Sequence, residues 1–171
     1  VIVAESPSEV ERISAVAQSL RVNARVAISV NTALEAPADA PVPPADAESK
    51  FGVSCSEAVD MYRRFDHMPH IQLRGLSAHT GQVTHTVETY ASAIERLVET
   101  ASIIRDRGQD VPMLDLGGGL PAIGVSTATP LLAEYAEAIK PILKDWIGTE
   151  TTLVIRPGRA IAASAGVLLL G

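Results

Sequence analysis

The chain alternates short apolar runs with longer segments of helical period, and this alternation continues along most of its length. The apolar runs fall at residues 1–4, 26–30, 71–78, 113–116 and 151–155. Between them, apolar residues recur three or four positions apart. Strands that alternate with helices form parallel sheets, because each helix carries the chain back to the start of the next strand. The pattern therefore predicts an α/β fold with five parallel strands.

Local signals predict where the helices begin and end. The segments Ser6–Glu9 and Ser54–Glu57 both have the capping-box pattern, so each opens a helix. A third helix carries its apolar stripe as far as Ile104 and ends before Gly108. A fourth is expected from Thr129 through Trp146, and the proline at position 141 should kink it or split it in two.

Composition excludes several classes of protein. With 171 residues and a net charge of −6, the chain can build one core, and no Lys/Arg cluster suggests a nucleic-acid partner. No apolar run reaches the roughly 18 residues that a membrane span needs. The single cysteine, Cys55, forms no internal disulfide, so we expect a reducing, cytoplasmic location. Residues 32–50, rich in Ala, Pro and acidic side chains, should form an exposed loop.

Three motifs follow the carboxyl ends of successive predicted strands. They are His79-Thr80-Gly81-Gln82, Leu114-Asp115-Leu116-Gly117-Gly118-Gly119 and Arg156-Pro157-Gly158-Arg159. In a (β/α)8 barrel, the carboxyl ends of all strands meet at one face, where active sites lie. An open doubly wound sheet instead concentrates binding at one switch point. Three separate motifs therefore favour a barrel, of which five strands are only a part.

Each motif has a chemical interpretation and a plain structural one. Three glycines after a strand let backbone N–H groups approach a phosphate, but they also form ordinary turns. The two arginines suit a phosphate or carboxylate, although Pro-Gly is a common turn pair. His79 can stack on an aromatic cofactor or move protons, or be a core residue. Lys50 lies in a polar loop and is interpreted as structural or phosphate-adjacent. No histidine has partners at metal-ligand spacing, so no metal is expected.

Taken together and in order, these motifs resemble the type III fold of pyridoxal-phosphate enzymes, the diaminopimelate and ornithine decarboxylase family. The resemblance covers nearly the whole chain. Its matching segments are Val30-Asn31, Ser49-Lys50-Phe51-Gly52, Gly75 to Gln82, Leu114 to Gly119, Arg156 to Arg159 and Ala165 to Leu168. It implies a barrel of the alanine racemase and ornithine decarboxylase type. Residues 1–164 would form part of this cofactor-binding barrel, and residues 165–171 would begin the connection to a carboxyl-terminal β-domain.

The resemblance also implies roles for individual residues toward pyridoxal 5'-phosphate. His79 would stack on the pyridine ring, and the backbone amides of Gly117, Gly118 and Gly119 would hold the phosphate. The remaining cofactor-binding positions would be Gln82, Arg156, Gly158 and Arg159, and Arg159 would meet the phosphate or the substrate carboxylate. No catalytic residue is expected within the chain, because the family's Schiff-base lysine lies on a strand upstream of Val1.

Two positions depart from the family pattern. Arg156 replaces the family glutamate that pairs with the pyridine nitrogen, and Gln82 replaces a serine after the histidine motif. A permanent cation at position 156 disfavours a protonated pyridine ring, so the cofactor would stabilise a carbanion less well. Related alanine racemases also carry an arginine at this nitrogen, so cofactor binding remains expected.

The leading hypothesis is therefore the central part of a homodimeric, cytoplasmic decarboxylase that acts on a diamino acid such as diaminopimelate or ornithine. The segment alone would be inactive. The alternatives are an amino-acid racemase-like enzyme, a non-catalytic homologue that binds the cofactor, and an unrelated α/β domain with coincidental turns.

Overall fold

A single parallel sheet forms the frame of the computed structural model, which describes residues 1–32, 51–79, 86–122 and 130–166. Its strands pair in the order β1-β2-β3-β4-β5, and every neighbouring pair is parallel. The strand bounds are β1 (Ile2–Ala4), β2 (Ala24–Asn31), β3 (Ile71–His79), β4 (Met113–Asp115) and β5 (Thr152–Val154). The five strands predicted from the sequence are thus confirmed, with β1, β4 and β5 shorter than the apolar runs.

Helices connect successive strands. They are α1 (Pro7–Leu20), α2 (Cys55–Phe65), α3 (Val87–Asp106), α4 (Leu132–Ile139) and α5 (Gly158–Ala162), followed by the 3₁₀ turn η1 (Ala163–Ala165). The first three begin where a side-chain hydroxyl accepts a hydrogen bond from the N–H group three residues later. The capping residues are Ser6, Ser54 and Thr86, which satisfy one of the free amides at each helix start. The two serine caps are the ones that the sequence predicts.

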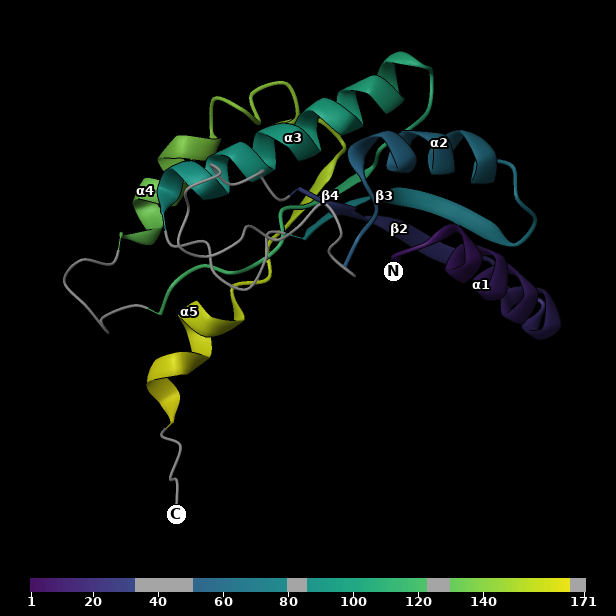
Figure 1. Cartoon of the computed structure of the whole chain (residues 1–171), viewed down its shortest axis with the longest axis horizontal. Helices are drawn as coiled ribbons and strands as arrows, with labels where there is room; N and C mark the ends of the chain where they lie inside the picture. Colours follow the sequence, from purple (N-terminus) through teal and green to yellow (C-terminus); the bar gives the residue numbers. More distant parts are fainter. Residues whose placement is uncertain (33–50, 80–85, 123–129, 167–171) are drawn as a thin grey trace, which may run out of the picture.

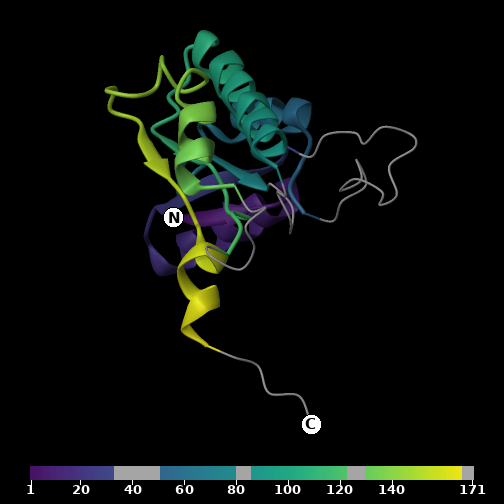
Figure 2. The same cartoon turned by 90° about the vertical axis from the view of Figure 1, so that its left-hand side faces the viewer.

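The arrangement of the elements is that of a barrel segment. Figure 1 shows α2, α3 and α4 along one side of the sheet. A salt bridge of 2.5 Å joins Arg64 of α2 to Glu11 of α1. Strand order follows chain order without a reversal, whereas a doubly wound sheet reverses direction at its switch point. The fold therefore supports the barrel interpretation. Beyond β5, the chain leads through α5 away from the sheet, as Figure 2 shows.

The fourth helix is shorter than the predicted one. It begins at Leu132 and ends at Ile139. Lys140 caps it, and Pro141 follows directly. Pro141 has no N–H to continue the helical ladder, and the chain follows turns from there to residue 148. Trp146 is nevertheless buried, with the Arg105 guanidinium 4.3 Å from its ring centre. The predicted break at the proline is correct, but residues 140–148 form turns where the second half of a split helix was expected.

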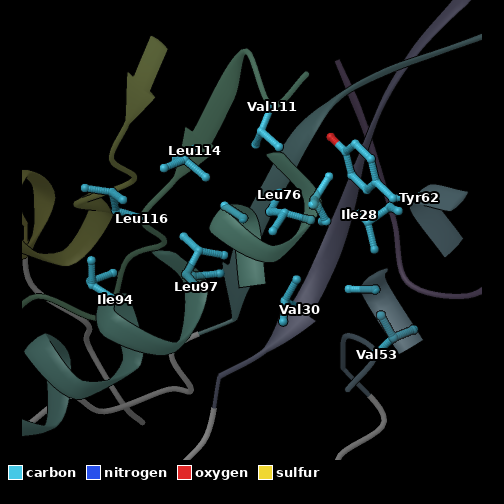
Figure 3. Close-up of a cluster of buried hydrophobic side chains, with 14 of the residues drawn as sticks. Ile28, Val30, Val53, Tyr62, Leu76, Ile94, Leu97, Val111, Leu114 and Leu116 are labelled. Carbon is cyan, nitrogen blue, oxygen red and sulfur yellow. The ribbon is translucent and has the colours of Figure 1, made fainter. Parts of the chain in front are cut away.

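The core lies between the sheet and the helices. Figure 3 shows part of this cluster, which includes Ile28, Val30, Val53, Tyr62, Leu76, Ile94, Leu97, Val111, Leu114 and Leu116. Leu76 of β3 and Leu114 of β4 are partners in register and are completely buried. Along a strand, successive side chains point to opposite faces. The residues after these two leucines therefore belong to the other face of the sheet.

One glycine makes the sheet possible at its centre. Gly75 has φ of +146°, and a Cβ atom there would lie 1.8 Å from the carbonyl oxygen of Met113. The pairing of β2 with β3 shifts register by one residue at this point, between Val26 and Ala27. A bulge at Gly75 thus brings β3 close against β4.

None of the described helices is both long enough and apolar enough to cross a membrane.

Candidate functional site at the carboxyl ends of the strands

The motifs that the sequence singles out meet at one edge of the sheet. His79 is the last residue of β3, paired in register with Asn31 at the end of β2. The glycine loop follows β4, and Arg156 follows β5. A backbone hydrogen bond of 2.8 Å from the Arg156 N–H to the Gly117 carbonyl joins the last two. The strand-end convergence expected of a barrel is therefore present.

The Phe51-Gly52 end of a fourth motif lies beside the end of β2. Val53, which follows it, donates its N–H to the Ser29 carbonyl at 2.9 Å and accepts from the Asn31 N–H at 2.8 Å. Gly52 has φ of +72°, and a Cβ there would lie 2.7 Å from the Asn31 nitrogen. Only glycine fits so close to the strand, so this residue fixes the segment at the carboxyl edge. Lys50 lies outside the described residues.

The glycine triplet is an irregular segment after β4, referred to below as the glycine turn, in which the sign of φ alternates. Gly117 and Gly119 have φ of +76° and +80°, and Gly118 between them does not have a positive φ. Without a Cβ, these residues let a neighbouring group approach the backbone closely. A Cβ on Gly118 would lie 2.5 Å from the carbonyl oxygen of Arg156. The turn therefore packs directly against the chain that leaves β5.

A buried carboxylate lies under this turn. The side chain of Asp115, the last residue of β4, is 6% exposed. Its Oδ2 accepts a hydrogen bond from the Ser77 hydroxyl at 2.7 Å, and its Oδ1 accepts one from the Gly117 N–H at 2.9 Å. Ser77 and Asp115 are partners in register on β3 and β4. They form a polar pair on the sheet face opposite the leucine core.

Arg156 neutralises this carboxylate. Its Nε donates to Asp115 Oδ2 at 2.9 Å and to Oδ1 at 3.1 Å. Its Nη2 donates to the Ser77 hydroxyl at 3.3 Å and to the Ala78 carbonyl at 3.1 Å. One arginine side chain thus connects the ends of β3, β4 and β5. The Arg156 side chain as a whole stays 54% exposed at this edge of the sheet.

The remaining predicted site residues lie nearby or outside the described part. Gly158 and Arg159 begin α5, two and three residues after Arg156, and both are exposed. They therefore follow the same strand end as the arginine network. Gln82 lies outside the described residues. Within the described ranges, no group of three or more His, Cys, Asp or Glu side chains is placed to hold a metal ion.

A tyrosine from the helix layer supports the turn. The Tyr90 hydroxyl of α3 donates to the carbonyl of Leu116, the residue before the glycines, at 3.1 Å. Burial, with a smaller contribution from the negative charge of Asp115, raises the pKa of Tyr90 to about 12. The phenol is therefore neutral at physiological pH and remains a hydrogen-bond donor.

Sequence reasoning did not identify Ser77, Asp115 or Tyr90 as parts of the site. Asp115 carried a signal, because an acidic residue at the end of an apolar run and before three glycines must find partners once buried. Its two side-chain partners are Ser77 of β3 and Arg156, just after β5, which are 38 and 41 residues away in sequence. Periodicity does not reveal such distant pairs.

Comparison with known proteins gives a consistent set of relatives. Residues 1–163 match the family described as pyridoxal-dependent decarboxylase, pyridoxal binding domain. The diaminopimelate decarboxylase of Pseudomonas aeruginosa is 36% identical over 165 residues, covering 96% of this chain and 39% of that protein. The enzyme of the same name from Zymomonas mobilis is 32% identical over 170 residues, with the same coverage.

A solved structure agrees with these sequence matches. Diaminopimelate decarboxylase from Helicobacter pylori, complexed with L-lysine, superposes with a TM-score of 0.79 at 28% identity. The match covers 93% of this chain and 40% of that one. The chain thus spans about two fifths of the length of the relatives it matches.

Proposed function

Because the chain belongs to the pyridoxal-dependent decarboxylase family, we propose that the full-length protein is an amino-acid decarboxylase that uses pyridoxal 5'-phosphate and acts on diaminopimelate. The observation that carries the proposal is the convergence of the glycine turn, the arginine network and the end of β3 at one edge of the sheet. The proposed substrate is the one for which the relatives at 36% and 32% identity, both diaminopimelate decarboxylases, are named. Ornithine is the second candidate substrate.

The residues present fit the cofactor's phosphate. Gly117 and Gly119 have positive φ, and the close approach of the Arg156 carbonyl leaves no room for a side chain at Gly118. The Gly117 N–H donates to Asp115 Oδ1, so in this proposal the amides of Gly118 and Gly119 hold the phosphate, and Gly158, Arg159 and Gln82 complete its surroundings. Arg159 meets either the phosphate or the substrate carboxylate, since its guanidinium suits both.

His79 is assigned to the cofactor's ring. Its position at the end of β3, next to the Ala78 carbonyl that Arg156 binds, puts it beside the same network. We assign it to stacking on the ring, where it would fix the ring's orientation. When bound, pyridoxal phosphate supplies an electron sink for the carbanion that remains after carbon dioxide leaves. The protein's part is to hold the cofactor and orient the substrate.

The full-length enzyme needs groups beyond these residues. In that enzyme, the lysine that attaches the cofactor would lie on a strand upstream of Val1, and a carboxyl-terminal β-domain would follow from about residue 165 onward. The enzyme would be a homodimer in the cytoplasm. The 171-residue segment by itself is therefore expected to be inactive.

Arg156 motivates a second candidate function. A guanidinium facing the ring nitrogen favours an unprotonated ring and a weaker electron sink, which suits racemisation better than decarboxylation. If the lysine is also absent, a cofactor-binding protein without catalysis is the remaining candidate. The engagement of Arg156 with Asp115, Ser77 and Ala78 limits how far its side chain can reach.

Turnover by the purified full-length protein separates these functions. The protein is incubated with pyridoxal phosphate and with diaminopimelate, ornithine or lysine, and carbon dioxide and product handedness are followed. Release of carbon dioxide from diaminopimelate supports the proposal. A change of handedness without carbon dioxide supports the racemase, and cofactor binding without either supports the non-catalytic protein.

A glycine variant tests the placement of the phosphate. In the full-length protein, Gly118→Ala should weaken pyridoxal-phosphate binding at least about tenfold, because the Cβ displaces the turn from the Arg156 carbonyl. Gly166→Ala is the matched control, since its Cβ meets nothing within 4 Å and its φ is not positive. Equal affinities of both variants and the wild type, measured by absorbance titration, would remove the glycine turn from the cofactor site.

A further inference from the structure

The glycine turn lies directly over a buried negative charge. Asp115 is nearly inaccessible, and its Oδ1 is 2.9 Å from the Gly117 nitrogen. A phosphate dianion held by the same turn would lie within a few ångströms of this carboxylate. At such separations in a partly buried site, a single charge changes the affinity of another ion by about tenfold or more. Cancelling the charge of Asp115 should therefore strengthen the binding of an anion at this turn.

In this chain, Arg156 contacts both Asp115 and the glycine turn, through two parts of the same residue. Its Nε–H is shared between both oxygens of Asp115, at 2.9 and 3.1 Å, in a charge-assisted contact that offsets the negative charge. Its backbone N–H holds the Gly117 carbonyl at 2.8 Å, and its own carbonyl packs where a side chain on Gly118 would lie. Arg156 thus affects both the net charge beside the turn and the position of the turn's backbone.

Ser77 completes the network and keeps it in register. Its hydroxyl donates to Asp115 Oδ2 and accepts from Arg156 Nη2. It is 1% exposed, on the strand next to Asp115. The hydroxyl carries no charge. Removing it therefore changes the hydrogen bonds of the network and leaves the net charge beside the turn unchanged.

We propose that Arg156 is a positioning residue for phosphate binding: its guanidinium cancels the charge of Asp115 so that the glycine turn accepts a phosphate dianion. The inference rests on the proposed function, which assigns the cofactor's phosphate to this turn. It gives Arg156 a role through Asp115 and Gly117. In this role Arg156 acts without contacting the cofactor's ring.

Charge deletion in the full-length protein tests the proposal, with inorganic phosphate and pyridoxal phosphate as probes in equilibrium titrations. Arg156→Met keeps the aliphatic length and removes the charge, so both affinities should fall at least about tenfold. Asp115→Asn leaves an uncompensated guanidinium and should bind both probes at least as tightly as the wild type. The double variant Asp115→Asn with Arg156→Met removes both charges and should return to within about threefold of the wild type.

The recovery in the double variant is the decisive readout. If Arg156 served only to hold the turn in shape, the double variant would bind no better than Arg156→Met, and the proposal would be overturned. Ser77→Ala is the matched control, because it removes a hydrogen bond without a charge and should change affinity by no more than about threefold. Arg156→Lys keeps the charge and should retain most of the affinity; a loss equal to that of Arg156→Met would contradict the proposal.

Two further outcomes separate this inference from the function on which it rests. Wild-type protein that binds neither probe overturns the proposed cofactor site, and the inference with it. Wild-type protein that binds both probes while Arg156→Met binds them equally well overturns the inference alone. Thermal unfolding identifies variants that do not fold. If Arg156→Met is among them, the comparison of Asp115→Asn and the double variant with the wild type decides: weaker binding by Asp115→Asn overturns the proposal.

Discussion

Neighbouring residues of β3 and β4 serve opposite faces of the sheet. Leu76 and Leu114 are partners in register and pack into the apolar cluster beneath the helices. One position further along, Ser77 and Asp115 are also partners, and they hydrogen-bond to each other at 2.7 Å. Both pairs are buried, but the first pair is held by packing and the second by a polar network that includes Arg156.

The difference shows that the two faces of one strand have different roles: one contributes to the stability of the fold, and the other to the charge at the site. On the leucine face, removing atoms leaves a cavity, and the whole fold loses free energy. On the polar face, removing a charge changes the field at the glycine turn while most of the packing stays. Substitutions on the two faces should therefore separate loss of stability from loss of anion affinity, even at adjacent positions.

The largest loss of stability should come from a substitution at Gly75, because the pairing of β3 with β4 positions both faces. Gly75→Ala would place a Cβ atom 1.8 Å from the Met113 carbonyl oxygen, so β3 and β4 could not pair as they do. We expect a loss of more than about 4 kcal/mol in the free energy of unfolding, or no folded protein. Denaturant unfolding of the full-length protein measures this. Gly166→Ala, with no atom within 4 Å of its Cβ, should unfold like the wild type.

The next effect tests the leucine face alone. Leu114→Ala should lower the free energy of unfolding by about 2–5 kcal/mol, because the side chain is completely buried. The protein that remains folded should bind phosphate as the wild type does. Leu131→Ala is the matched control, since that leucine is 66% exposed and its loss should cost less than about 0.5 kcal/mol. A large loss of phosphate affinity in Leu114→Ala would show that the two faces are not separable.

A smaller loss of stability is expected from Tyr90, whose side chain reaches from the helix layer to the glycine turn. Tyr90 lies in the helix layer and donates to the Leu116 carbonyl beside the glycine turn. Tyr90→Phe removes this buried hydrogen bond and should cost about 1 kcal/mol at neutral pH. Chemical denaturation at pH 7 measures the loss, and an unchanged stability would mean that the bond contributes nothing.

The pH dependence of Tyr90 has a defined sign. Its pKa is raised from 10.0 to about 12, so the folded state holds the proton more tightly than the unfolded state. Its contribution to stability is fully present below pH 10 and is lost as the pH rises toward 12. Stability should therefore fall over this interval, and less steeply in Tyr90→Phe than in the wild type.

The smallest effect should come from a second buried tyrosine. The Tyr62 hydroxyl is buried and makes no hydrogen bond to any described residue, and burial raises its pKa. Tyr62→Phe therefore removes a polar atom without breaking a bond, and should leave stability unchanged or raise it by up to about 1 kcal/mol. Thermal unfolding beside Tyr90→Phe makes the comparison direct. A loss as large as that of Tyr90→Phe would mean that the Tyr62 hydroxyl has a partner.

The sequence by itself determined the strands, the first helix caps and the order of the elements. These depend on interactions between residues a few positions apart, such as the hydroxyl of Ser6 with the N–H of Glu9. It also placed the glycine and arginine motifs at strand ends, and their resemblance to a known family was confirmed over residues 1–163. The effect of Pro141 was predictable for the same reason, because a missing N–H acts within one turn of helix.

Only the tertiary structure decided how the site is held. The partners of Asp115 come from separate strands, and no pattern of spacing predicts that Arg156 would pair with this carboxylate and with Ser77. The bulge at Gly75 and the contact between Gly118 and the Arg156 carbonyl are of the same kind. The physical reason is that local propensities act along the chain, whereas the pairing of buried charges depends on which strands become neighbours.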